Sequence, residues 1–342
     1  MSKRLISLFA GIGGFDVGFE RAGFRIVAHV EKDAKCRKLL ATKWPDAISL
    51  DDVCTAGANN LPPCDVLAFG FPCQDLSVAG KRAGLAGGRS GLFYEATRII
   101  NELTPTYCLF ENVPGLLSSS GGDDYLRVLR EMDRLGYSGA WRVLDAQWFG
   151  VAQRRRRVFG CFSKLDAGAE CCGEILSLPE SLRGHPAPSL KAEEDSPCPS
   201  AIGARAGQED NSGNEADAYI GTPIVGYTQS SFGGYREGCG TLRASGGDLG
   251  GGSESLILET AKIGDDSCDN RLNIAPTGPS IRRLTPTECE RLQGFPDGWT
   301  AGFSDTVRYK MLGNAVCVTV AEWIARRMAT VMDSQYTTGE NT

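Results

Sequence analysis

The sequence predicts an α/β protein with a doubly wound, mostly parallel sheet and a second, smaller irregular β domain. The first 163 residues alternate short apolar segments with amphipathic ones, as strands alternating with helices do. The chain has 342 residues, which is more than one domain usually holds. Residues 165–280 differ from the rest in composition, which favours a second domain there.

The composition indicates which kinds of site and which cellular compartment the protein can have. The 13 cysteines contain no Cys-x-x-Cys pair, which argues against a zinc site or a disulfide framework. Scattered thiols without a signal peptide indicate a reducing cytoplasm, and no apolar run reaches the length of a membrane span. With only His29 and His185 present, histidine acid–base chemistry and a histidine metal site are both disfavoured.

The formal net charge is −6, but the acidic residues are concentrated in one part of the chain. Residues 165–280 hold 7 Lys and Arg against 18 Asp and Glu, so the rest of the chain holds 29 against 24. The densest basic cluster is the run of four arginines at 154–157. A local patch of this kind can bind phosphate whatever the overall charge, so a nucleic acid remains a candidate partner.

A glycine-rich turn follows the first predicted strand. Residues 5–9 are an apolar strand, 10–14 read Ala-Gly-Ile-Gly-Gly, and 15–22 predict a helix. This order indicates a nucleotide-binding opening, in which glycines let a ligand approach the backbone. The next predicted strand, 25–30, ends at Glu31, where a carboxylate suits a ribose diol. The alternative is a solvated carboxylate at a strand end.

Further elements continue the alternation. Asp51 and Asp52 follow the third predicted strand, and a carboxylate there can accept from an adenine amino group or cap the next turn. Apolar periodicity predicts an amphipathic helix over 315–332. The remaining predicted elements are helices at 33–43, 92–102 and 124–135 and strands at 47–50, 66–71, 107–110, 138–144 and 158–162.

One predicted strand ends in a thiol. Residues 66–71 are apolar, Pro72 ends the strand because it has no backbone N–H, and Cys73 follows. A cysteine at the carboxyl end of a strand is well placed to meet a ligand in an open α/β fold. The alternative is that Cys73 is a small buried hydrophobic residue, as most free cysteines are.

Glu111 repeats this arrangement after the strand 107–110, because it too ends an apolar strand shortly before a proline. Two neighbouring strands would then deliver a nucleophile and an acid to one crevice. A partly buried carboxyl group there can donate a proton near neutral pH. The arginine run 154–157 can be an exposed edge, or it can hold a phosphate and a carbonyl oxygen.

Together these residues resemble the DNA (cytosine-5) methyltransferase family of bacterial and phage type. The resemblance covers nearly all of the first 163 residues and resumes from about 281 to 330, in the family's order. The matching stretches are Phe9-Ala10-Gly11-Ile12-Gly13-Gly14, Glu31, Gly70-Phe71-Pro72-Cys73-Gln74, Glu111-Asn112-Val113, Gln153 to Arg157, Arg283 to Pro296, and Gly313-Asn314-Ala315-Val316.

The resemblance implies methyl transfer from S-adenosylmethionine, without a metal, to C5 of a cytosine in a specific duplex DNA sequence. Cys73 thiolate would attack C6 while Glu111 protonates N3, which activates C5. Arg157 resembles the arginine that contacts O2 of the base, with Arg155 supporting it. Because C6 is stacked inside duplex DNA, the cytosine must be flipped out.

The family's ligand contacts carry over to matching positions. The segment Gln74 to Gly91 resembles the mobile loop that closes over the flipped base, and its five glycines suit a hinged lid. Lys32 departs from the family, which commonly has an adenine-stacking residue there. The implied cofactor residues are Phe9, Gly11, Gly13, Gly14, Glu31, Asp52, Pro72, Leu92, Asn314 and Val316, and the implied DNA-binding residues are Gln74, Ser77, Lys81 and Arg89.

The resemblance also implies a catalytic domain at 1–165 and 305–335 and a target-recognition domain at 166–304. Residues 186–217 have few large apolar residues, which predicts a flexible segment. The segment from Tyr227 to Leu258 predicts a small β unit that presents loops. Within it, Arg243 either contacts guanine in DNA or offsets nearby acidic residues.

The expected partner is double-stranded DNA, bound by a monomer. A further expected partner is a restriction endonuclease that acts on the same DNA sequence. One rival is an RNA cytosine-5 methyltransferase of the same fold. Another is a catalytically inactive DNA-binding relative, which the presence of Cys73, Glu111 and the arginine run disfavours. A dinucleotide-dependent dehydrogenase is also disfavoured, because the Cys73 and Glu111 pair would have no role in it.

Overall fold

The computed structural model describes residues 2–71, 91–178, 225–229, 235–237, 255–259 and 280–339. They belong to two compact units, one with β1–β7 and α1–α8 and the other with β8–β11. The strands of the first unit are β1 (Arg4–Leu8), β2 (Arg25–Val30), β3 (Ile48–Leu50), β4 (Val66–Phe69), β5 (Tyr107–Asn112), β6 (Ser138–Asp145) and β7 (Arg156–Ser163). Its helices are α1 (Gly14–Arg21), α2 (Ala34–Lys43), α3 (Gly91–Leu103), α4 (Asp123–Arg134), α5 (Gly168–Leu176), α6 (Pro286–Leu292), α7 (Asp305–Asn314) and α8 (Val318–Gly339). None of the helices in the described ranges is both long and apolar enough to cross a membrane.

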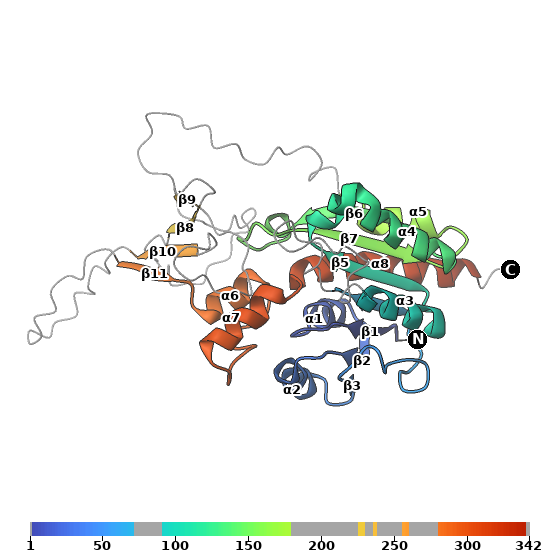
Figure 1. The fold of residues 1–342 in the computed structure, drawn as a ribbon, viewed down its shortest axis with the longest axis horizontal. Helices are drawn as coiled ribbons and strands as arrows, with labels where there is room; N and C mark the ends of the chain where they lie inside the picture. Colours follow the sequence, from blue (N-terminus) through green and yellow to red (C-terminus); the bar gives the residue numbers. More distant parts are fainter. Residues whose placement is uncertain are drawn as a thin grey trace, which may run out of the picture. The chain divides into compact units, whose positions relative to one another are not determined.

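Seven strands form one sheet in the order β3-β2-β1-β4-β5-β7-β6 (Figure 1). Strands β1 to β5 are parallel to their neighbours, whereas β7 runs antiparallel to both β5 and β6. The predicted doubly wound, mostly parallel sheet is therefore confirmed. The direction of the strand order reverses between β1 and β4, and open α/β sheets bind ligands at the carboxyl ends of strands beside such a reversal.

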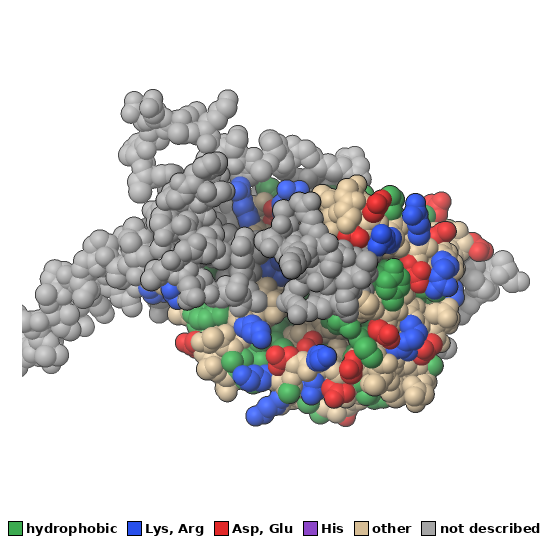
Figure 2. All heavy atoms as spheres, viewed as in Figure 1, with side chains coloured by type: hydrophobic (Ala, Val, Ile, Leu, Met, Phe, Trp, Pro, Cys, Tyr) green, Lys and Arg blue, Asp and Glu red, His purple; other side chains and the backbone are tan. Residues whose placement is uncertain are grey.

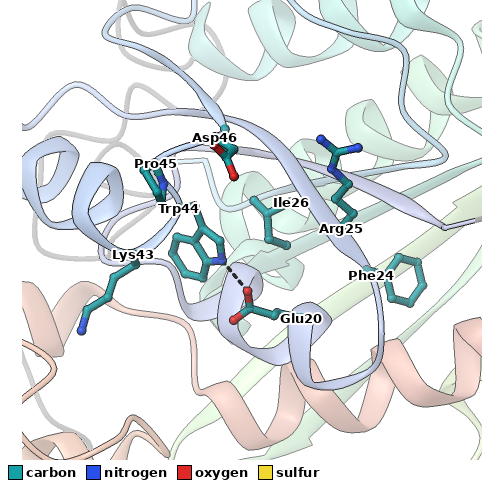
Figure 3. A pocket seen from close by; sticks show the side chains of 9 residues that line it. Glu20, Phe24, Arg25, Ile26, Lys43, Trp44, Pro45 and Asp46 are labelled. Atoms are coloured by element: carbon teal, nitrogen blue, oxygen red, sulfur yellow. Dashed lines mark hydrogen bonds between the residues drawn. The ribbon is translucent and has the colours of Figure 1, made fainter.

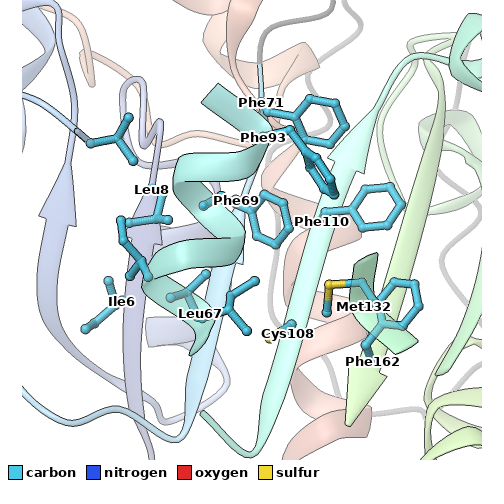
Figure 4. Packing of buried hydrophobic residues seen from close by; sticks show 14 of the residues in the cluster. Ile6, Leu8, Leu67, Phe69, Phe71, Phe93, Cys108, Phe110, Met132 and Phe162 are labelled. Carbon is cyan, nitrogen blue, oxygen red and sulfur yellow. The ribbon is translucent and has the colours of Figure 1, made fainter. Parts of the chain in front are cut away.

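Helices α3 and α4 cover one face of this sheet. Four phenylalanine rings gather at the carboxyl end of that core, from β4, the residues after it, α3 and β5 (Figure 4). The ring centroid of Phe71 lies 5.2 Å from that of Phe93 and 6.2 Å from that of Phe110. Each buried aromatic ring contributes about 1.5–3 kcal/mol of transfer free energy, so this cluster fixes where β4 and β5 end.

The opposite face carries α1, α5 and α8, and α8 packs against the other two. The close approach of α1 and α8 depends on Gly18, since a Cβ atom there would lie 2.7 Å from Ala321. The helix predicted at 315–332 is thus present as the first part of α8. An ion pair of 2.6 Å between Lys3 and Asp333 further ties α8 to the start of the sheet.

Helix α5 was not predicted from the sequence. It packs against β6 and β7 through buried Cys172, Ile175 and Leu176. Although α5 and α6 fall within the range 166–304, both belong to the first unit, together with α7 and α8. The assignment of 166–304 to target recognition stays a prediction.

The second unit contains an antiparallel sheet of four strands in the order β11-β10-β8-β9. Three of its strands fall in the segment where the sequence predicted a small β unit. The segment 186–217 lies outside the described residues. The strands are β8 (Val225–Gln229), β9 (Tyr235–Glu237), β10 (Ser255–Glu259) and β11 (Ser280–Arg283).

Candidate active site

The glycine-rich turn connects β1 to α1 at the carboxyl edge of the sheet. Phe9, Gly11 and Gly13 adopt positive φ angles of 53°, 56° and 86°. The amide of Gly13 donates a hydrogen bond of 2.9 Å to the carbonyl oxygen of Ala10, which closes the turn. A Cβ atom added at Gly11 would meet no atom within 4 Å, so the turn is open at that position.

The other two glycines of the turn lie against protein atoms. A Cβ atom at Gly13 would lie 2.8 Å from the ring of Trp44, and one at Gly14 would clash with the carbonyl oxygen of Val316. Packing therefore excludes a side chain at both positions, whereas at Gly11 the Cβ position faces free space. The same contact places Val316, a predicted cofactor residue, beside the turn.

Glu31 follows β2 and bridges two backbone segments. Its Oε2 accepts a hydrogen bond of 2.7 Å from the amide of Gly11, and its Oε1 accepts one of 2.7 Å from the amide of Asp33. Both carboxylate oxygens are thus oriented by backbone donors, and each keeps a second lone pair. The structure brings the two predicted cofactor residues Glu31 and Gly11 together.

Asp52 lies in the turn after β3. Its Oδ1 accepts a hydrogen bond of 2.9 Å from the amide of Cys54, and this backbone hydrogen bond lowers the pKa of the Asp52 carboxyl group. Arg98 of α3 fixes the turn, because its Nη2 donates to the carbonyl oxygens of Val53 at 3.0 Å and Ala56 at 2.9 Å. Sequence reasoning did not single out Arg98.

Two predicted catalytic side chains meet where β5 and β7 pair. Strand β5 continues beyond its predicted end, so Glu111 is a strand residue paired with Phe159. Nε of Arg157 lies 3.0 Å from Oε1 of Glu111, and the two side chains are 16% and 13% exposed. The two groups form an ion pair, but the Arg157 N–H is not aligned for a hydrogen bond to Oε1. Among the described residues, none therefore donates a hydrogen bond to the buried Oε1 of Glu111.

The end of β4 lies beside this pair. A Cβ atom at Gly70 would be 3.7 Å from Oε2 of Glu111, and Nδ2 of Asn112 donates to the carbonyl oxygen of Phe71 at 3.3 Å. The chain that leads to Cys73 therefore passes next to Glu111. The predicted site residues Pro72, Cys73, Gln74, Ser77, Lys81, Arg89 and Arg243 lie outside the described residues.

Arg155 contacts the backbone of another predicted cofactor segment. Its buried guanidinium donates to the carbonyl oxygens of Gly313 at 3.4 Å and Ala315 at 2.8 Å, on either side of Asn314. Burial lowers the pKa of Arg155 to about 10, which still leaves it charged near neutral pH. Nearby, Nε2 of Gln153 donates to the carbonyl oxygen of Leu292 at 2.9 Å.

The arginine run alternates between two environments. Arg154 and Arg156 are exposed, whereas Arg155 is buried and Arg157 is half-buried, as expected for successive residues that enter a strand. On the face shown in Figure 2, Lys and Arg side chains are interspersed with Asp and Glu side chains. Leu92, another predicted cofactor residue, is partly buried at the start of α3.

A hollow of about 270 Å³ lies away from this edge (Figure 3). Arg25 and Ile26 at the start of β2 line it, whereas Glu31 follows the opposite end of that strand. Trp44 also lines it and donates from Nε1 to Oε1 of Glu20 at 2.8 Å. Within the described ranges, no group of three or more His, Cys, Asp and Glu side chains is placed to bind a metal ion.

Comparisons with known sequences identify the family of this chain. The family model for C-5 cytosine-specific DNA methylases matches residues 3–194 and 197–330. Type II methyltransferase M.NlaX of Neisseria lactamica is 30% identical over 338 residues, which cover 97% of each chain. Type II methyltransferase M.HhaI of Haemophilus parahaemolyticus is 26% identical, over 94% of this chain and 93% of that one.

Solved structures share the fold. The methyltransferase EhMeth of Entamoeba histolytica superposes with a TM-score of 0.61 at 16% identity, over 98% of this chain and 99% of that one. The Dnmt2 methyltransferase of S. pombe superposes with a TM-score of 0.60 at 16% identity, over 97% of this chain and 99% of that one. From the family match across nearly the whole sequence, we conclude that this chain belongs to the C-5 cytosine-specific DNA methylases, a family of S-adenosylmethionine-dependent DNA methyltransferases.

Proposed function

We propose that this chain transfers a methyl group from S-adenosylmethionine to C5 of a cytosine flipped out of a specific duplex DNA sequence, through a bond between Cys73 and C6. The observation that carries the proposal is the half-buried pair of Glu111 and Arg157, which lies beside Gly70, three residues before the thiol. A carboxyl group and a guanidinium together can bind the N3 and O2 edge of cytosine.

The residues at the carboxyl edge fit S-adenosylmethionine. Gly11 leaves space at the turn, and each oxygen of Glu31 keeps a lone pair for a ribose hydroxyl. Asp52 follows β3 at the same edge, where it can accept from an adenine amino group. When bound, the cofactor supplies an electrophilic methyl group on a sulfonium sulfur.

Cys73 is the nucleophile of the proposed reaction. Glu111 first takes a proton from solvent. The Cys73 thiolate then forms a bond to C6 as N3 takes this proton from Glu111, and C5 gains the electron density of an enamine. C5 then bonds to the methyl carbon, whose bond to sulfur breaks with both electrons going to sulfur. Solvent accepts the C5 proton, the freed pair restores the C5–C6 double bond, Cys73 leaves as thiolate, and N3 returns its proton to Glu111.

The ion pair prepares the site for the base. Oε1 of Glu111 is buried with an unfilled acceptor position, and protonated N3 or the N4 amino group of cytosine supplies the donor it needs. Arg157 offers donors for O2 from the neighbouring strand. Because each charge already holds the other in place, less side-chain entropy is lost when the base binds.

Duplex DNA is the proposed substrate, bound by one copy of the chain. The target base must leave the helix, and the segment Gln74 to Gly91 is proposed to close over it. We assign target recognition to residues 166–304. Two of the relatives are Type II methyltransferases, which supports a role beside a restriction endonuclease of the same recognition sequence.

The nucleophile can be tested by trapping. Duplex DNA with 5-fluorocytosine at the target should form a covalent adduct with the wild-type protein, because fluorine cannot leave as the C5 proton does. Cys73→Ala should form no adduct and should lose turnover, yet keep DNA affinity, because phosphate contacts hold the duplex. The matched control is Cys171→Ala, which removes a partly exposed free thiol of α5 and should keep both adduct and turnover. Turnover retained by Cys73→Ala would contradict the assignment.

The RNA alternative is separable by competition. Methyl transfer to a duplex DNA library should be unaffected by an excess of tRNA, and tRNA alone should accept no methyl groups. Preferential methylation of tRNA would instead favour the RNA enzyme. Bisulfite sequencing of DNA from cells that express the protein would give activity and target sequence together, and no methylation at any site would favour an inactive relative.

A further inference from the structure

The indole of Trp299 reaches the glycine-rich turn from the far end of the chain. Its Nε1 donates a hydrogen bond of 2.9 Å to the carbonyl oxygen of Ile12, which is 287 residues away in the sequence. Both residues are buried. The contact is not part of the proposed reaction, and Trp299 lies between two stretches that resemble the family, Arg283 to Pro296 and Gly313 to Val316.

The indole is itself held rigidly. Its ring stacks on Phe295, with centroids 5.5 Å apart, and Nζ of Lys43 lies 4.3 Å above it. Buried Glu290 accepts hydrogen bonds of 2.7 Å from the amides of Gly298 and Thr300, on either side of Trp299 in the chain. Rigid backbone and ring contacts therefore fix the direction of the N–H group.

The carbonyl that Trp299 holds is central to the turn. Ile12 lies between Gly11 and Gly13, whose positive φ angles are only one of the conformations that glycine adopts readily, so the turn needs support from other residues. Fixing the Ile12 carbonyl fixes the peptide plane between Ile12 and Gly13, and Gly13 in turn donates to Ala10 to close the turn. The open position at Gly11 and its contact with Glu31 depend on this geometry.

We propose that Trp299 is a positioning residue for the cofactor: its N–H group preorganises the glycine-rich turn for S-adenosylmethionine. This inference rests on the proposed function, because it takes the turn to be the cofactor site. A turn without the indole hydrogen bond samples other peptide orientations before the cofactor binds. The cofactor must then select the competent one, which weakens binding without changing the reacting groups.

A merely structural role predicts something different. If the hydrogen bond stabilised the folded protein equally with and without bound cofactor, its loss would lower the free energy of unfolding and leave cofactor affinity unchanged. The neighbouring Trp44 offers a comparison, because its ring lies 5.9 Å from that of Trp299 and its own N–H group donates to Glu20. Replacing Glu20 removes the hydrogen bond of the Trp44 indole but leaves the hydrogen bond from Trp299 to the Ile12 carbonyl oxygen intact.

The experiment compares full-length Trp299→Phe with Glu20→Ala. Loss of one net hydrogen bond corresponds to about a threefold to tenfold change in an equilibrium constant. Trp299→Phe should raise the calorimetric Kd for S-adenosylmethionine, measured without DNA, by that factor. The KM for the cofactor should rise similarly, while kcat at saturating cofactor and the KM for DNA stay within twofold. Glu20→Ala should leave all four values unchanged.

Several outcomes would overturn the inference. An unchanged cofactor Kd for Trp299→Phe, or an equal rise in both variants, would reduce Trp299 to a structural residue. Wild-type protein that binds no S-adenosylmethionine would instead overturn the proposed function itself. If Trp299→Phe does not fold, benzothienylalanine at position 299 keeps the bicyclic ring and replaces only the N–H group by sulfur, and the same rise in Kd is expected.

Discussion

The guanidinium of Arg155 donates a hydrogen bond of 2.8 Å to the carbonyl oxygen of Ala315, which joins the arginine run at the start of β7 to the link between α7 and α8. Resemblance alone grouped Arg155 with the catalytic residues. Its contacts with Gly313 and Ala315 show that it also holds the backbone around Asn314 in place.

Arg155→Ala should therefore lower the free energy of unfolding by about 3 kcal/mol, because it leaves buried carbonyl oxygens without a charged donor. Urea unfolding measures this loss. The matched control is Arg156→Ala, next along the strand, where an exposed side chain should change stability by no more than about 0.5 kcal/mol. Equal effects of both substitutions would contradict the bracing role of Arg155.

Glu111→Gln should lower the methyl-transfer rate by about 10²–10⁴ while DNA affinity changes little, because the amide cannot supply a proton to N3. Glutamine keeps the size of the side chain beside Arg157, so a folding defect is not expected. Single-turnover kinetics gives the rate, and a filter-binding titration gives the affinity. A rate within twofold of wild type would exclude Glu111 as the acid.

Glu31→Ala should weaken S-adenosylmethionine binding by about 1–3 kcal/mol, because charge-assisted hydrogen bonds to the ribose are lost. Calorimetry on the folded variant measures this change. Glu31→Gln should not rescue binding, since one carboxylate oxygen becomes an amide group that meets the N–H group of Gly11 or Asp33. An unchanged Kd for Glu31→Ala would show that Glu31 is a solvated carboxylate at a strand end and does not bind the cofactor.

Asp16 should make the protein less stable as pH rises. Burial in α1 raises the pKa of its carboxyl group to about 7, although Ser7 donates to Oδ1 at 2.7 Å. Between about pH 4 and pH 7 the folded protein then holds a proton that the unfolded chain has lost, so stability falls across this window and is constant above it. Buried His29 acts oppositely, since burial lowers its pKa to about 4 and acidification below its usual value of 6.5 destabilises the fold.

Asp16→Asn removes the titrating group and keeps the oxygen that faces Ser7. The unfolding free energy of the variant, relative to that of wild type, should rise by about 2 kcal/mol between pH 5 and pH 8. This value is smaller than the full pKa shift of Asp16 would give at 1.36 kcal/mol per pKa unit. Urea unfolding at several pH values tests this. A difference between the two proteins that does not depend on pH would show that Asp16 does not titrate in this range.

Arg243→Ala tests target recognition. If Arg243 reads guanine, the variant should lose about 1–3 kcal/mol on the cognate sequence and relax preference at one position. If it contacts phosphate only, affinity should fall equally on all sequences and the salt dependence should weaken by about one unit. Methylation profiling on random-sequence duplexes separates these outcomes, with Arg236→Ala in β9 as the comparison. An unchanged profile and rate would remove Arg243 from the interface.

The order of the elements could be predicted because the central strands β1, β4 and β5 are buried on both faces and read as apolar runs between clear breaks. Helix α5 could not, since it is only 9 residues long and includes two glycines, so its local signal is weak. It is stabilised by packing on β6 and β7, which the sequence does not display.

The site was predictable where a group follows a strand, as Glu31 does, because neighbouring parallel strands bring such groups to one edge. The roles of individual residues were harder to predict. Gly13 and Gly14 look like ligand contacts in the sequence, but their Cβ positions are filled by Trp44 and Val316. The contact of Trp299 with Ile12 joins residues 287 positions apart, and no local pattern encodes such a pair.

The packing of α1 on α8 has a consequence during translation. Gly14 and Gly18 of α1 lie against Val316 and Ala321, so these contacts form only when about 300 further residues have been made. At a synthesis rate of about 5–20 residues per second, this takes roughly 15–60 seconds. Throughout that interval the face of α1 that packs against α8 in the finished protein is uncovered. A ribosome that stalls before residue 316 therefore leaves a fragment in which this face of α1 stays exposed and the glycine-rich turn lacks its contact with Val316.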